Sequence, residues 1–268
     1  MSNTPEPPGD PAKTKALRPR DAATLVIIDR VMGTPRVLMG RRRLDQVFMP
    51  GKYVFPGGRV DDSDRTTPSA DELDPAEIAK LLLDMKGTPS QVRARALGMA
   101  AIRETFEEAG LVIGTPADGP AERKSNDPSW CAFFDCGYRP KLSTLSLFAR
   151  AITPPGRPRR YDTRFFCISA EEISHRVDSS DGELSGLHWL TIEEARSLDL
   201  PTITRVILED LTDFLSAGNG RPGNAPVPYY HHKNGTFRRE LLCLTDAPAR
   251  LDTPGGNGML RSSSNEPA

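Results

Sequence analysis

The sequence predicts an α/β protein in which helices cover a mixed β-sheet on both sides. Short runs of β-branched and other apolar residues are interspersed with segments that repeat apolar residues at helical spacing. These segments do not follow the regular strand–helix–strand order that is typical of a doubly wound parallel sheet. We therefore expect an α/β/α sandwich around a mixed sheet.

Length and composition favour one sizeable domain with tails, although two small domains are an alternative. The chain has 268 residues, of which 37% are hydrophobic and 26% charged. The proline-rich residues 1–20 and the polar residues 251–268 are predicted to be disordered, and residues 21–250 to fold. Cys131 and Cys136 lack a second pair at zinc-ligand spacing, so we expect idle thiols rather than a zinc site.

Charge and hydropathy limit the classes of partner. The net charge of -1 offers no general attraction to nucleic acid or to an anionic membrane. No apolar run reaches the roughly 20 residues that span a bilayer, and the start of the chain lacks a signal-peptide core. We expect a cytoplasmic protein with a small-molecule substrate, no nucleic-acid partner and no membrane partner, and we leave a homodimer open.

The first half of the chain predicts three strands and two helices. Two β-rich runs joined by a Gly/Pro turn predict a hairpin, and a third strand should stop at a Pro-Gly-Gly turn. The predicted strands are 23–29, 36–41 and 52–55, and the predicted helices are 74–85 and, from about Gln91 to Ala109, a longer one.

The second half adds strands, two helices and a hairpin. Thr191 and Glu194 form a capping-box pattern at the start of one helix, and Asn234-Gly235 is typical of a tight hairpin turn. The predicted strands are 143–152, 159–168 and 186–190, the predicted helices 191–198 and 202–218, and the hairpin arms 228–233 and 236–241.

Three glutamates share one face of the longer helix, close to its C-terminal end. Glu104, Glu107 and Glu108 stand at spacings i, i+3 and i+4. Gly110 suits the left-handed residue that ends a helix. Anions near a helix C-terminus cost about 0.3–1 kcal/mol each, so stability alone does not explain them. They are either a solvated acidic face relieved by Arg103 or ligands for a hard divalent cation.

Two motifs together resemble the Nudix hydrolase family. Its box reads Gly-x5-Glu-x7-Arg-Glu-U-x-Glu-Glu-x-Gly-U, where U is apolar. The chain offers FPGG at residues 55–58 and RETFEEAGL at residues 103–111, and only Thr105 departs from the second part of the box. The matching residues of that part are Arg103, Glu104, Glu107, Glu108, Gly110 and Leu111.

The spacing of the box is the larger departure. The family pattern has 14 residues between its first glycine and its arginine, whereas 44 residues separate Gly58 from Arg103. Asp64 stands where the box has its first glutamate, so the insertion is predicted at about 65–89. Lengthening a loop costs only about 0.6 kcal/mol per doubling, so the glycine turn and the helix can still meet.

The resemblance implies a Nudix-type fold over residues 21–250 and a pyrophosphohydrolase that depends on Mg²⁺ or Mn²⁺. It assigns Glu107 and Glu108 as metal ligands, Glu104 as a ligand or general base, and Arg103 as the residue that orients the glutamates. Glycines after a strand let the backbone approach a phosphate or offer a carbonyl to a metal, so Gly57 and Gly58 are candidate substrate-binding positions.

The segment before the box is similar to that of coenzyme A diphosphatases and their insert-bearing relatives. Leu38, Arg42, Gly51 and Phe55 match their pattern. Three positions depart from it: Gly40, Arg43 and Val47. The resemblance implies coenzyme A or acyl-coenzyme A as substrate. Pyrophosphatases of ADP-ribose, NADH or dinucleoside polyphosphates remain alternatives, as does a non-catalytic Nudix-like ligand sensor.

Further substrate contacts are expected from four side chains. Arg42 and Phe55 come from the coenzyme A-like segment, Arg164 from a strand, and Glu183 from a loop where this family often has an accessory acid. The alternatives are a solvated strand end, core packing and plain surface. The apolar cluster at residues 78–85 of the insertion either forms a lid or acyl pocket, or merely covers the sheet.

Overall fold

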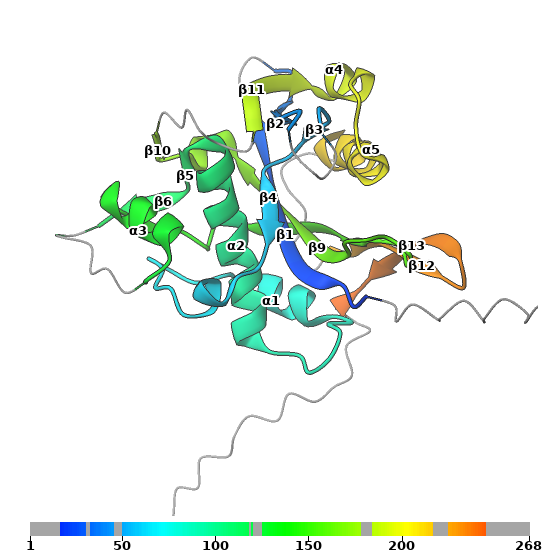
Figure 1. The fold of residues 1–268 in the computed structure, drawn as a ribbon, viewed down its shortest axis with the longest axis horizontal. Helices are drawn as coiled ribbons and strands as arrows, with labels where there is room; N and C mark the ends of the chain where they lie inside the picture. The colour runs from blue at the N-terminus through cyan, green and yellow to red at the C-terminus, as the bar shows by residue number, and fades with distance from the viewer. Residues whose placement is uncertain are drawn as a thin grey trace, which may run out of the picture.

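A computed structural model of the chain describes residues 17–30, 33–45, 50–117, 119, 125–177, 184–216 and 225–244 (Figure 1). Its centre is a nine-stranded sheet with the order β11-β2-β1-β9-β8-β12-β13, in which β3 pairs with β2 and β4 with β1. The strands are β1 (Arg20–Asp29), β2 (Arg36–Arg42), β3 (Tyr53–Val54), β4 (Gly57–Arg59), β8 (Ser146–Ile152), β9 (Tyr161–Ser169), β11 (Leu184–Thr191), β12 (Val227–Lys233) and β13 (Thr236–Leu242). The sheet is mixed because β1–β9 and β12–β8 are parallel and the other pairs are antiparallel.

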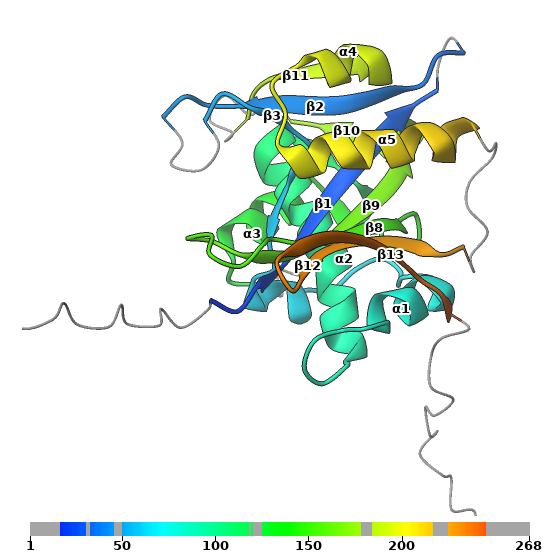
Figure 2. The same cartoon turned by 90° about the vertical axis from the view of Figure 1, so that its right-hand side faces the viewer.

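Helices lie on both sides of this sheet, as Figures 1 and 2 show. The helices are η1 (Asp62–Arg65), α1 (Pro75–Leu82), α2 (Gln91–Ala109), α3 (Pro128–Asp135), η2 (Ala170–Glu172), α4 (Ile192–Ser197) and α5 (Thr202–Ser216). Two further sheets pair β5 (Leu111–Val112) with β10 (His175–Arg176) and β6 (Gly114–Pro116) with β7 (Tyr138–Pro140). No described helix is both long and apolar enough to cross a bilayer.

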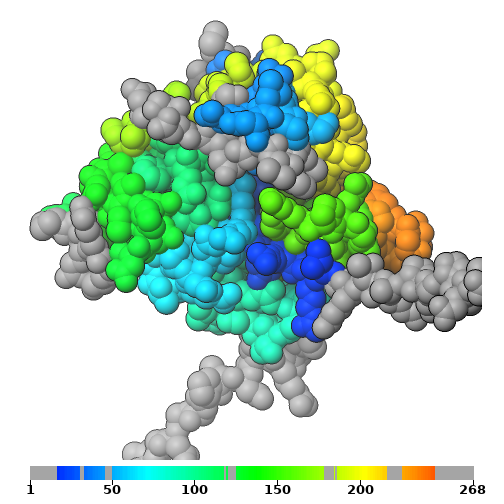
Figure 3. All heavy atoms as spheres, in the orientation of Figure 1, coloured from blue at the N-terminus to red at the C-terminus, as the bar shows by residue number. Residues whose placement is uncertain are grey.

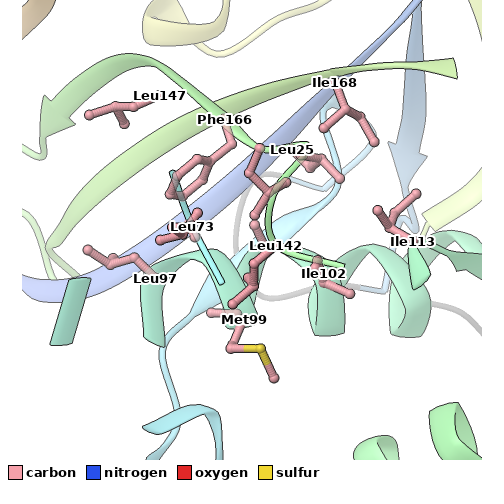
Figure 4. Close-up of a cluster of buried hydrophobic side chains, with 14 of the residues drawn as sticks. Leu25, Leu73, Leu97, Met99, Ile102, Ile113, Leu142, Leu147, Phe166 and Ile168 are labelled. Atoms are coloured by element: carbon pink, nitrogen blue, oxygen red, sulfur yellow. The ribbon is translucent and has the colours of Figure 1, made fainter. Parts of the chain in front are cut away.

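The alternation of side chains along β1 divides the core into two clusters. Leu25 and Ile27 point to the first cluster with residues of α1, α2 and α3, whereas Val26 and Ile28 point to the second with residues of α4 and α5. Figure 4 shows Leu25 of β1 and Ile102 of α2 among the side chains of the first cluster. The predicted α/β/α sandwich around a mixed sheet is confirmed.

Most predicted elements appear close to their expected bounds, and α2 spans Gln91–Ala109. The third predicted strand ends before the Pro-Gly-Gly turn, as expected, because β3 stops at Val54. The glycines themselves begin β4, in which Gly57 pairs with Thr24 of β1. A Cβ atom on Gly57 would come within 2.5 Å of the Ala23 carbonyl oxygen, so only glycine allows this approach. α3 was not expected from the sequence.

The segment predicted as an insertion is built into the first core cluster. Leu81 and Met85 are buried there, and Figure 3 shows the surrounding cyan-to-turquoise segment at the lower surface. Glu77 accepts a hydrogen bond from Lys80 Nζ (2.5 Å) and another from the Leu147 amide (2.7 Å). Of the two alternatives for residues 78–85, the structure supports the helix that covers the sheet, because its apolar side chains face the core.

Candidate active site

The site is built on the last turns of α2. Ser90 caps the start of this helix, and Gly110, with φ +65°, ends it with a hydrogen bond from its amide to the Phe106 carbonyl (2.9 Å). Met99 and Ile102 are completely buried against the sheet. This packing fixes the rotation of the helix, so that the glutamate face meets the glycine turn in β4.

The glycine turn and the helix touch directly, although they lie far apart in the sequence. The Gly57 amide donates a hydrogen bond to Glu108 Oε2 at 2.8 Å. A Cβ atom on Gly58 would lie 2.4 Å from Glu104 Oε2. The strand pairing therefore needs glycine at position 57, and the absence of a side chain at position 58 leaves room for the Glu104 carboxylate.

Arg103 is the central cation of the site, and its side chain is 3% exposed. Its Nη1 donates to Glu104 Oε1 at 3.0 Å and to Glu107 Oε1 at 2.8 Å. On its other side, Nε and Nη2 hold both oxygens of Asp64 at 2.9 and 3.0 Å, and Nη2 also donates to the Arg59 carbonyl. The five hydrogen bonds use all five guanidinium protons.

Asp64, at the position of the first glutamate of the box, is buried and anchors Arg103. It also accepts hydrogen bonds from the indole Nε1 of Trp130 (3.0 Å) and from the Asp61 amide (2.8 Å). Trp130 was not among the site residues expected from the sequence. A tryptophan in an apolar helix needs a partner for its N–H, and Asp127 before Pro128 is typical of a helix start, but neither signal identifies Asp64 as the partner.

The cluster carries uncompensated negative charge. Burial raises the pKa of Glu104 to about 7, and the charges of Glu107 and Asp64 add to this, while Arg103 opposes it. Burial alone lowers the pKa of Arg103, but the hydrogen bonds that it donates to Asp64 and the charges of the neighbouring carboxylates raise this pKa above its ordinary value. Arg103 therefore stays charged, whereas Glu104 exchanges its proton near neutral pH.

The donor set suits a hard divalent cation. Glu104, Glu107 and Glu108 offer carboxylate oxygens from one helix face, and their side chains are 13%, 34% and 4% exposed. As arranged in the described part of the chain, no three acidic, His or Cys side chains converge on one ion position. The reason is that Glu104 and Glu107 turn to Arg103 and Glu108 turns to the Gly57 amide.

Arg42 of β2 reaches the same cluster. Its Nη1 lies 3.9 Å from Glu108 Oε1, and its side chain is 14% exposed. Gly40, which departs from the coenzyme A pattern, lies under Leu184 of β11, and a Cβ atom there would come within 2.6 Å of the leucine Cδ1. The departure at Gly40 therefore has a packing reason.

Two expected substrate contacts are not brought to the cluster, and a third lies outside the described residues. Phe55 is 4% exposed and packs in the second core cluster. Arg164 is buried beside β8, where its Nη1 contacts Asp162 Oδ1 at 2.6 Å and lies near Asp21. Both corrections have one physical cause, since each side chain points into the core. Glu183 lies in the range 178–183, which the structure does not describe.

Comparisons with known proteins agree with this geometry. The family model of the NUDT19 Nudix domain matches residues 19–199. The acyl-coenzyme A diphosphatase NUDT19 of Homo sapiens is 30% identical over 209 residues, which are 60% of this chain and 54% of that protein. The protein of the same name in Gallus gallus is 29% identical over 196 residues, 55% of this chain and 52% of that protein. The chain thus spans about half the length of these relatives.

A solved structure supports the fold. The crystal structure of a NUDIX hydrolase from Alicyclobacillus acidocaldarius is 26% identical, with a TM-score of 0.52, and the match covers 72% of this chain and 90% of that one.

Proposed function

The chain belongs to the NUDT19 Nudix domain family of Nudix hydrolases, and from this premise we propose that it hydrolyses the diphosphate of coenzyme A or acyl-coenzyme A. The observation that carries the proposal is the contact of the glycine turn with the glutamate face of α2, through Gly57 and Glu108. It joins the two parts of the box across a long intervening segment. The names of the two similar diphosphatases support the choice of substrate.

Nudix hydrolases generally use divalent metal ions, and we propose Mg²⁺ or Mn²⁺ here. Glu107 and Glu108 would hold the ion, with Glu104 either as a third ligand or as the general base. When bound, it would supply Lewis-acid activation of water and neutralise phosphate charge. The hydrogen bonds from Arg103 Nη1 keep the carboxylates of Glu104 and Glu107 in place before the ion binds.

Glu104 is the candidate general base. In the metal-free protein, burial raises its pKa to about 7. A carboxylate with a pKa in this range can accept a proton from water and release it again near neutral pH. Water adds to one phosphorus and one bridging P–O bond breaks. The products are two phosphate monoesters, an adenosine phosphate and a phosphopantetheine-type product.

Arg42 is the candidate phosphate ligand from the protein. It lies beside Glu108 at the cluster, and a guanidinium can bind phosphate oxygens in a bidentate manner. The backbone of Gly57 and Gly58 offers a surface without side chains beside the same carboxylates.

The test is a panel of substrates with Mg²⁺ or Mn²⁺, in which products are identified by mass. The panel contains coenzyme A, acyl-coenzyme A esters, ADP-ribose, NADH and dinucleoside polyphosphates. We expect the highest kcat/KM with a coenzyme A ester and a 4′-phosphopantetheine-type product. Preference for ADP-ribose or NADH would contradict the substrate, and binding without any hydrolysis would indicate a ligand sensor.

A further inference from the structure

The carboxylate of Asp64 is fully buried and fully bonded. Oδ1 accepts from Arg103 Nε and Trp130 Nε1, and Oδ2 accepts from Arg103 Nη2 and the Asp61 amide. The side chain is 0% exposed, so no water contact replaces a lost donor at low cost. Four hydrogen-bond donors from three residues therefore fix the rotamer of Asp64. One of the three residues, Trp130, lies outside the Nudix box.

That outside donor belongs to α3. Asp127 caps this helix by accepting from the amides of Ser129 and Trp130, and it also accepts from Ser63 Oγ in η1 at 3.2 Å. Trp130 is completely buried, and its ring contacts Phe133 and Phe134. The indole N–H is thus held at a fixed place beside Asp64 by two independent connections.

Arg103 links the fixed position of Asp64 to the positions of Glu104 and Glu107. Asp64 clamps one edge of the planar guanidinium, at Nε and Nη2, and the remaining nitrogen, Nη1, donates to both Glu104 and Glu107. Because the group is rigid and planar, a rotation of Asp64 turns Nη1 away from the two carboxylates. A shift of this kind changes ligand geometry without removing a ligand.

We propose that Trp130 is a positioning residue for the metal-binding glutamates, acting through Asp64 and Arg103. The indole N–H holds the short aspartate side chain against the guanidinium, and the guanidinium sets the directions of Glu104 and Glu107. This inference rests on the proposed function, since it assigns a role in the same site. It concerns a residue of α3, which lies outside both parts of the box.

The first experiment removes the indole N–H of Trp130 and keeps the packing of an aromatic ring at this position. Trp130→Phe deletes the donor, and site-specific 3-benzothienylalanine at position 130 replaces N–H by sulfur in a ring of the same size. Phe133→Leu is the matched control, because Phe133 is equally buried in α3 and contacts Trp130 but gives no hydrogen bond to Asp64. Mn²⁺ binding is measured by electron paramagnetic resonance, and kcat and KM with the best substrate of the panel.

We expect both Trp130 replacements to weaken Mn²⁺ binding or lower kcat by about tenfold, as is typical when a partner of a metal ligand is lost. KM should change little. Phe133→Leu should leave both within about twofold, even if its melting temperature falls further. The sulfur analogue preserves the packing, so it should fold even if Trp130→Phe does not. If the sulfur analogue and Phe133→Leu change Mn²⁺ binding and kcat equally, the proposal is overturned.

A double-mutant cycle tests the route through Asp64. Once Asp64→Asn has been made, Trp130→Phe should have little further effect on Mn²⁺ affinity, because the shared partner is already lost. Effects that multiply would overturn the route. If the wild type binds Mn²⁺ but hydrolyses no diphosphate, the proposed function fails, and the Mn²⁺ measurements still decide the positioning role.

Discussion

The carboxylate of Glu104 lies so close to the backbone of Gly58 that a Cβ atom there would come within 2.4 Å of Oε2. The obstacle is the end of a side chain that can rotate, so Gly58→Ala should leave the fold intact and displace the carboxylate. We expect kcat to fall by about 100-fold, in the range that loss of an oriented catalytic group produces.

Stability supplies the control for this prediction. Any fall in melting temperature caused by Gly58→Ala should disappear when Glu104→Ala is also present, because the clash is then removed. A Gly58→Ala variant with normal kcat would show that the Glu104 carboxylate does not need its present place.

Glu107→Gln and Glu108→Gln should each remove most of the activity while the protein stays folded. The apolar side of α2 holds the helix in place, whereas Glu107 accepts from Arg103 and Glu108 from the Gly57 amide. Steady-state rates at limiting Mg²⁺ and circular dichroism provide the measurement. Glu209→Gln is the matched control, since Glu209 is exposed on α5 across the sheet. Near-normal turnover of either site variant at limiting Mg²⁺ would show that the substituted residue is not a metal ligand.

The metal-free protein should lose stability relative to Glu104→Gln as the pH rises. The pKa of Glu104 in the folded state is about 7, above its usual 4.5, so the folded state binds the proton more tightly than the unfolded state. This contribution is complete below about pH 4.5 and is lost as the pH rises through about 7. Melting temperatures of both proteins between pH 5 and 8, in the presence of a chelator, test the sign. A constant difference would argue against the shifted pKa.

Leu81→Ala in α1 should destabilise the protein by about 2–5 kcal/mol, the cost of a buried leucine, and leave substrate preference unchanged. Denaturant unfolding measures the first effect. The ratio of kcat/KM for a long-chain acyl-coenzyme A to that for ADP-ribose measures the second. Val92→Ala, at a half-exposed position of α2, is the control for a lost apolar side chain. A selective loss of activity on the long-chain ester would support the alternative that residues 78–85 line an acyl pocket.

Substitution of Arg42 should affect substrate binding, whereas substitution of Asp162 should affect stability. Arg42→Gln should raise KM about tenfold with little change in melting temperature, because Arg42 lies at the carboxylate cluster. Asp162→Asn should cost about 3–5 kcal/mol of stability, because it leaves the buried Arg150 and Arg164 without their shared carboxylate. Substrate titrations and denaturant unfolding of both variants test the contrast. A normal KM for Arg42→Gln would remove Arg42 from the site.

Local patterns in the sequence were sufficient for most of the long strands and helices and for the box. The helical spacing of Glu104, Glu107 and Glu108 and the stop at Gly110 are properties of neighbouring residues, so α2 could be predicted with its bounds. The resemblance to the box added the glycine turn as the expected partner of the helix.

Only the tertiary structure decided where single side chains end. Phe55 and Arg164 carry the residue types of substrate contacts, yet the packing of the sheet turns both inward. Trp130 meets Asp64 across 66 positions of sequence, and no local pattern specifies such a contact. Spacing along the chain determines which residues share a face of one element, because the backbone geometry is regular. The partner of a face depends on how elements pack, which is set by the burial of the whole core and by the need of each buried polar group for a hydrogen bond.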